Sequence, residues 1–160
     1  MRMENRGDMV YRSALKSALR ILARREHSVF ELSQKLVHRG YEEETVRQVV
    51  AECRRLNYLD DRRAADQLID RLQRKGLGMR RIRHELEKRG LDDRQAEARL
   101  RVRVTPADER SLACRVALKK LKSLESETYS QAKKLKLQRF LRYRGFSDYL
   151  IIEVVKEMLA

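Results

Sequence analysis

Three histidines and two cysteines are the side chains of this sequence with the widest range of possible chemistry. The histidines, His27, His38 and His84, match no metal-ligand spacing such as His-Glu-x-x-His, so they indicate no metal site. Isolated at these positions, they are expected to be surface or capping residues. Cys53 falls on an apolar helical stripe, which is typical of a small buried side chain rather than of a nucleophile.

Two pairs of adjacent aspartates, Asp60-Asp61 and Asp92-Asp93, could bind a metal ion or do acid–base work. Both pairs fall where a helix is expected to begin, and helix capping accounts for them. The glycine-rich segment 75–78 lacks the Gly-Lys-Ser/Thr of a phosphate-binding loop. The sequence therefore predicts no enzyme, no metal and no cofactor. A metal-dependent enzyme stays open only if the two aspartate pairs converge in space.

The elements that carry these residues are expected to be helices. Most of the chain repeats apolar residues at the i, i+3, i+4, i+7 spacing of amphipathic helices. Six glycines and one proline are too few for the turns of an ordinary β-sandwich. Ser28 and Glu31 match a capping box, which marks a helix start. One segment, 94–103, has a thin apolar stripe because Arg99 and Arg103 occupy positions where apolar residues are expected. The fold class is therefore all-α.

A three-residue corner recurs along the chain, 50 and then 55 residues apart. The corners are Arg39-Gly40-Tyr41, Arg89-Gly90-Leu91 and Arg144-Gly145-Phe146. When the chain is aligned on them, apolar positions coincide: Leu32 with Ile82 and Leu137, and Leu36 with Leu86 and Leu141. This period predicts three tandem three-helix modules, 1–58, 59–104 and 105–160. Modules of this size bury little core alone, so each is expected to lean on its neighbour in an elongated, curved, basic body.

Charge is the strongest functional signal. The 160-residue chain holds 38 Lys and Arg against 24 Asp and Glu, a net charge of +14. Residues 1–58, 59–104 and 105–160 carry +4, +5 and +5, so the surplus belongs to the whole body rather than to a tail. So many uncompensated charges repel one another in a compact state. The partner is therefore expected to be negative, either a nucleic-acid backbone or an acidic groove on a protein.

The candidate binding residues come from the basic clusters. Residues 79–89 should bury Met79, Ile82 and Leu86, which turns Arg80 and Arg83 outward and leaves Arg81 near the boundary. Lys133, Lys136 and Arg139 occupy the corresponding second helix of the third module. They should extend the exposed basic stripe formed by Arg80, Arg81 and Arg83. We expect these six cations to carry more binding energy than the charges of the first module. The full set of candidate residues is Arg80, Arg81, Arg83, Lys133, Lys136, Arg139, Arg62 and Arg63.

Several short motifs, collinear over nearly the whole chain, resemble those of one known family. The first module carries His27-Ser28, Glu31-Leu32 and Lys35-Leu36, and Tyr58-Leu59-Asp60-Asp61 follows. The second module has Gly76-Leu77-Gly78, Arg81-Ile82, Glu85-Leu86 and Arg89-Gly90. The third has Lys136-Leu137-Gln138-Arg139-Phe140-Leu141 and Arg144-Gly145-Phe146. Together these motifs resemble the RecX family of recombination regulators.

The resemblance implies a modulator of the RecA recombinase. Members of this family bind RecA filaments in the helical groove and usually suppress ATP hydrolysis and strand exchange. The implied partners are the RecA filament and, weakly or through RecA, single-stranded DNA. A monomer is the default expectation for a solenoid-like body. A cytoplasmic location is expected, since no apolar stretch is long enough to span a membrane and residues 1–6 lack the apolar core of a signal peptide.

Three positions depart from the family pattern in local contact surfaces, and the fold that the pattern implies is unaffected. Met79 stands where the family commonly has proline, and Ala64 stands where an aromatic residue usually follows the aspartate pair. Leu121 falls where a Lys-Tyr or Arg-Tyr pair is common.

A protein that binds nucleic acid directly is the alternative function. Tandem three-helix modules resemble helix-turn-helix arrays, and the arginines of segment 80–83 could enter a groove. However, no recognition helix stands out, and few aromatic residues are placed for base stacking. A direct binder should hold naked DNA with a steep salt dependence, whereas a filament-dependent binder should prefer RecA-coated DNA.

Overall fold

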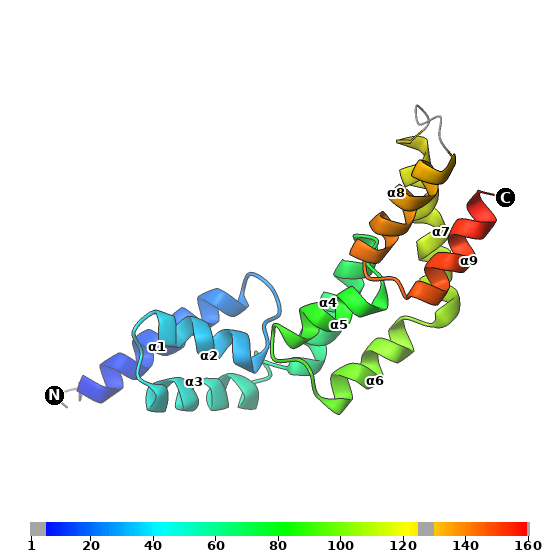
Figure 1. The fold of residues 1–160 in the computed structure, drawn as a ribbon. Helices are drawn as coiled ribbons and strands as arrows, with labels where there is room; N and C mark the ends of the chain where they lie inside the picture. The colour runs from blue at the N-terminus through cyan, green and yellow to red at the C-terminus, as the bar shows by residue number, and fades with distance from the viewer. Residues whose placement is uncertain (1–5, 125–129, 160) are drawn as a thin grey trace.

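The computed structural model describes residues 6–124 and 130–159, and all the regular structure within these ranges is helical (Figure 1). The expected all-α class is therefore confirmed. The helices are α1 (Arg6–Leu22), α2 (Val29–His38), α3 (Glu43–Arg55), α4 (Asp61–Arg74), α5 (Met79–Glu87), α6 (Arg94–Arg103), α7 (Pro106–Lys122), α8 (Ser130–Tyr143) and α9 (Asp148–Met158).

The helices form three groups of three that follow one another in an elongated, bent row (Figure 1). Each group encloses its own apolar core. Helices α1–α3 bury Leu32 and Leu36, α4–α6 bury Ile82 and Leu100, and α7–α9 bury a third set that includes Phe146. The expected tandem arrangement of three-helix modules is confirmed. We refer to the groups as the first, second and third modules.

Local capping signals place the helix starts. Ser28 and Glu31 form the expected capping box: the Ser28 hydroxyl accepts the Glu31 N–H at 3.0 Å, and the Glu31 carboxylate accepts the Ser28 N–H at 3.1 Å. Asp60 caps α4 by accepting the Arg62 N–H, and Asp93 caps α6. The aspartate pairs thus begin helices, as their positions predicted.

Ion pairs to α4 compensate for the thin apolar stripe of α6. Arg99 and Arg103, which occupy positions expected to be apolar, both form ion pairs with Asp66 of α4. Arg103 also reaches Asp70, with 2.7 Å between Nη1 and Oδ1. Hydrogen bonds from Arg99 and then Arg103 outweigh the effect of burial and lower the pKa of Asp66. Ion pairs therefore join α6 to α4 where apolar packing is sparse.

The second helices of the three modules lie end to end: α8 meets α5, and α5 meets α2 (Figure 1). The contact is made each time by the corner of one module against the N-terminus of the second helix of the preceding module. We call α8, α5 and α2 together the spine, and the two contacts the first and second junctions.

At the first junction, the corner of the second module meets α2. The Ser28 hydroxyl donates to the Arg89 carbonyl at 2.5 Å, and the Arg89 guanidinium lies 3.3 Å from the Glu31 carboxylate. Gly90 has φ +65°, and a Cβ added to it would lie 2.6 Å from the Cβ of Phe30. Only glycine fits this corner, because the conformation is left-handed and the space is filled.

At the second junction, the corner of the third module meets α5 in the same way. The N–H of Gly78 donates to the Arg144 carbonyl at 2.8 Å, and the N–H of Arg80 donates to the Gly145 carbonyl at 3.1 Å. Gly145 has φ +87°, and the backbone of Arg81 leaves no room for a Cβ. Both corners therefore bind the first turn of a helix in the preceding module.

An acidic side chain reinforces each junction. Asp61 of α4 accepts the N–H of Val29 at 2.7 Å, and Glu109 of α7 accepts the N–H of Met79 at 2.7 Å. These backbone donors belong to the first turns of α2 and α5, which have no carbonyl partner within their own helix. The junctions are thus closely equivalent although the acids come from different helical positions.

Candidate functional site

Each of the three arginines of α5 forms an ion pair with a carboxylate, which their sequence positions do not predict. Arg80 is exposed, but its guanidinium lies 3.1 Å from the carboxylate of Asp148. Arg83 is half-buried and makes two 2.9 Å hydrogen bonds to Glu97 of α6. The hydrogen bonds from Arg83 lower the pKa of Glu97 to about 2, so this carboxylate stays ionised at neutral pH. Arg83 therefore joins helices of its own module.

Arg81 is half-buried, as expected for a residue at the edge of the buried face of its helix, and it lies at the second junction. Its guanidinium sits 5.9 Å from the centre of the Tyr143 ring and 3.5 Å from the Glu85 carboxylate. Tyr143 is 76% exposed although it packs beside an arginine. The junction thus presents an aromatic ring and cations to solvent on one surface.

The α8 cations continue the line of α5, since the two helices meet end to end (Figure 1). Lys136 and Arg139 are exposed and Lys133 is half-buried. Exposed Lys119 of α7 and Lys134 of α8 add to the positive charge of the third module. The structure therefore places these cations on the same spine as the α5 arginines.

Arg62 and Arg63 at the start of α4 are exposed but serve structural contacts. The Arg62 Nε donates to the Gln95 side chain at 3.0 Å. The Arg63 side chain lies 3.1 Å from the Glu26 carboxylate and donates to the Asn57 carbonyl at 2.7 Å. Arg63 therefore links the second module to the loop before α2.

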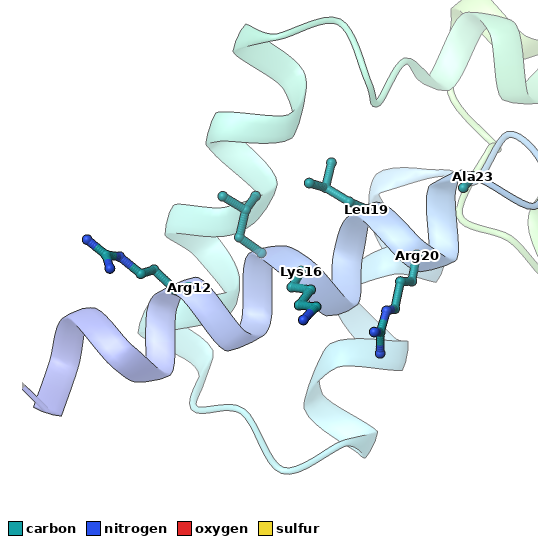
Figure 2. Close-up of a pocket in the computed structure, with 6 residues that line it drawn as sticks. Arg12, Lys16, Leu19, Arg20 and Ala23 are labelled. Atoms are coloured by element: carbon teal, nitrogen blue, oxygen red, sulfur yellow. The ribbon is translucent and has the colours of Figure 1, made fainter.

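A row of cations on α1 was missed at the sequence level. Arg12, Lys16 and Arg20 follow one another at four-residue spacing along a shallow depression of about 460 Å³, with Leu19 and Ala23 beside them (Figure 2). They lie opposite the buried face of Ala14, Ala18 and Ile21, and this spacing is the signal that could have identified them. Within the described residues, Lys16, Arg20 and Arg24 form no ion pair.

His27 is buried, so its expected surface position is wrong. It is 2% exposed and lies against the backbone before α2. Its Nδ1 is 2.9 Å from the Arg25 carbonyl and its Nε2 is 2.9 Å from the Lys35 ammonium, which fits a neutral ring with the proton on Nδ1. Burial, opposed in part by the bond to Arg25, lowers the pKa of His27 below its ordinary 6.5.

We expect the stability of the chain to fall as the pH drops below about 6.5. The unfolded chain takes up a proton at His27 in this range, whereas the folded chain resists it, so protonation favours unfolding. The loss is limited to about 1.4 kcal/mol per pH unit between the two pKa values. Urea denaturation at pH 7.5 and pH 5.5 measures it. His27→Gln should flatten the dependence, and an unchanged slope in that variant would assign the effect to other groups.

No group of three or more His, Cys, Asp or Glu side chains in residues 6–124 and 130–159 is placed to hold a metal ion. Burial raises the pKa of the Cys53 thiol, which disfavours a reactive thiolate. None of the described helices has the length and apolar character to cross a membrane. The surface chemistry of this part of the chain is that of cations on helices.

Comparison with known proteins agrees with this architecture. Residues 14–53 match a family model described as the first three-helix domain of RecX, and residues 60–100 match the second. A crystal structure of RecX from Lactobacillus salivarius has the same fold, with a TM-score of 0.79 over 92% of this chain and 96% of that one, at 21% identity.

Relatives named Regulatory protein RecX are similar over most of their length. The protein from Vibrio parahaemolyticus serotype O3:K6 is 37% identical over 135 residues, 84% of each chain. The protein from Legionella pneumophila strain Corby is 37% identical over 145 residues, 91% of this chain and 94% of the relative. With two matching domains and relatives this similar over this length, the chain belongs to the RecX family of regulatory proteins.

Proposed function

We propose that the protein binds the RecA–single-stranded DNA filament as a monomer, in the helical groove, and inhibits ATP hydrolysis, filament extension and strand exchange. The spine carries this proposal: its three helices meet end to end along an elongated, bent body, and two of them, α5 and α8, carry basic side chains (Figure 1). A long helical groove offers contact along such a body, and each module brings net positive charge to it.

The proposed contact surface combines α5 and α8. Lys133, Lys136 and Arg139 form its core, since α8 carries no acidic residue from 131 to 143. Arg80, Arg81 and Arg83 belong to it as well. However, acidic neighbours already neutralise part of their charge, and a partner must compete with those carboxylates. Arg62 and Arg63 are proposed as peripheral contacts.

ATP turnover by the cognate RecA on single-stranded DNA tests the function. Adding the protein at substoichiometric amounts should lower turnover and shorten the filaments, because one bound molecule blocks extension at its site. Equal turnover and filament length with and without the protein would contradict the proposal.

Replacing Lys133, Lys136 and Arg139 together by Ala should weaken filament binding by about 2 kcal/mol or more, roughly thirtyfold. The thermal melt should shift little, since exposed substitutions usually change stability by about 0.5 kcal/mol or less. Binding of the labelled protein to preassembled filaments measures the effect. The matched control replaces Lys16 and Arg20 of α1 together with Arg24, which lies just after this helix. If that triple variant binds as weakly, attraction is spread over the body and the α8 surface is not defined.

Direct binding of DNA is the second candidate, and the exposed ring of Tyr143 beside Arg81 favours it. Such a pair can stack a base and contact a phosphate. Competition separates the candidates: a direct binder holds naked single-stranded DNA with a steep salt dependence, whereas the proposed function requires a preference for RecA-coated DNA.

A further inference from the structure

The corner of the first module is built like the two docked corners, but within residues 6–124 and 130–159 no other module covers it. Gly40 has φ +87°, the same value as Gly145. A Cβ added to Gly40 would meet no atom within 4 Å, whereas Gly90 and Gly145 are covered by the first turns of α2 and α5. The backbone geometry for docking is therefore present and open.

The arginine of this corner also has no structural task among the described residues. At the first junction Arg89 pairs with Glu31, and at the second the Arg144 guanidinium donates to the Lys75 carbonyl at 2.5 Å. Both arginines thus bind the preceding module. The side chain of Arg39 is exposed and makes no hydrogen bond or ion pair within residues 6–124 and 130–159.

Two exposed apolar side chains of the first module, Val37 and Met9, lie near the open corner. Val37 is 45% exposed, and charged Glu87 and Arg142 stand at the equivalent positions of the other modules. Met9 of α1 is 58% exposed, and it lies one turn before Ser13, whose hydroxyl is 3.0 Å from that of Tyr41 in the corner. Exposed apolar groups beside free polar ones are typical of a binding surface.

We propose that the Arg39-Gly40 corner binds the N-terminal turn of a helix on a RecA protomer; this rests on the proposed function. The two junctions define the chemistry of the occupant. A small N-cap residue donates to the Arg39 carbonyl, as Ser28 and Gly78 do to Arg89 and Arg144. A following residue covers Gly40, as Phe30 and Arg81 cover Gly90 and Gly145. On the pattern of the first junction alone, where Glu31 pairs with Arg89, an acidic residue at the third helical position pairs with the Arg39 guanidinium. Helix N-termini favour such acids.

The third module of a second copy does not offer the complementary turn at the aligned position. Alignment on the corners places Lys133 at the position of Ser28 and Gly78, which are the N-caps of α2 and α5. Helix α8 begins at Ser130, so Lys133 lies inside it and the amides that follow bond within the helix. Continuation of the row by another copy would lose the contact that holds the modules together, and this favours a helix of the partner.

Charge reversal at the corner tests the docking. Arg39→Glu should bind preassembled RecA filaments at least tenfold more weakly than the unchanged protein, since a charged hydrogen bond is lost and repulsion of the acid is added. Arg54→Glu is the matched control, with the same charge change on an exposed arginine of α3 that makes no described side-chain contact. It should bind within about twofold of the unchanged protein.

Cross-linking identifies the occupant. Val37→Cys, made in a Cys114→Ser chain and labelled with a benzophenone maleimide, should cross-link to the first turn of a RecA helix with an acidic third residue. Cys53 is fully buried and stays unlabelled. Cross-links to DNA or to a second copy, or equal binding by Arg39→Glu and Arg54→Glu, would overturn the inference alone. Failure of the unchanged protein to bind the filament would overturn the proposed function together with it.

Discussion

Gly145→Val should separate the third module from the second. A branched side chain at φ +87° costs about 1–2 kcal/mol in backbone conformation. The added atoms also collide with the Arg81 backbone, so the hydrogen bonds from Gly78 and Arg80 to the corner break. Each is worth about 1 kcal/mol. We expect a total loss of about 3 kcal/mol or more, with the third module unfolding in a separate, earlier thermal transition.

Gly40→Val is the matched control for this experiment. Gly40 shares the φ of +87°, but a side chain there extends into open space. It should show only the conformational cost of about 1–2 kcal/mol and a single transition. Equal losses at Gly40 and Gly145 would show that the junction contributes nothing beyond backbone strain.

Leu86→Ala should destabilise the second module by about 2–5 kcal/mol. Leu86 is 2% exposed and packs among α4, α5 and α6, so truncation leaves a cavity in a small core. Urea denaturation at pH 7.5 measures the loss. Leu118→Ala on α7, where the side chain is 50% exposed, should cost far less. A loss below about 1 kcal/mol at Leu86 would contradict its place in the core.

The structural features that depend on residues close together in the sequence could be predicted. The capping box of Ser28 and Glu31, the aspartate caps and the apolar stripes depend on contacts within a turn or two of helix. The corners were recognisable because a left-handed residue at a helix end is most often glycine. Their repetition then led to three modules and an elongated body.

The contacts between residues that are far apart in the sequence could not be predicted. Arg80 pairs with Asp148, 68 residues away, and Arg99 pairs with Asp66, 33 residues away. Helical periodicity indicates which way a side chain faces, but it does not identify the charge that another module brings near it. The α5 arginines were therefore expected to be more available than they are. The docking of each corner on a helix of the preceding module could not be predicted for the same reason.

The spine has a mechanical consequence. Each module keeps its own core, and neighbouring modules meet through hydrogen bonds and ion pairs around one corner glycine. We therefore expect the body to bend at the two junctions and to stay stiff between them. A small rotation at either junction moves the far end of the neighbouring module over a much larger distance. A body of three modules joined in this way can bind along a helical groove whose pitch changes. Each module keeps its contacts with the groove, and small rotations at the two junctions accommodate the change in pitch.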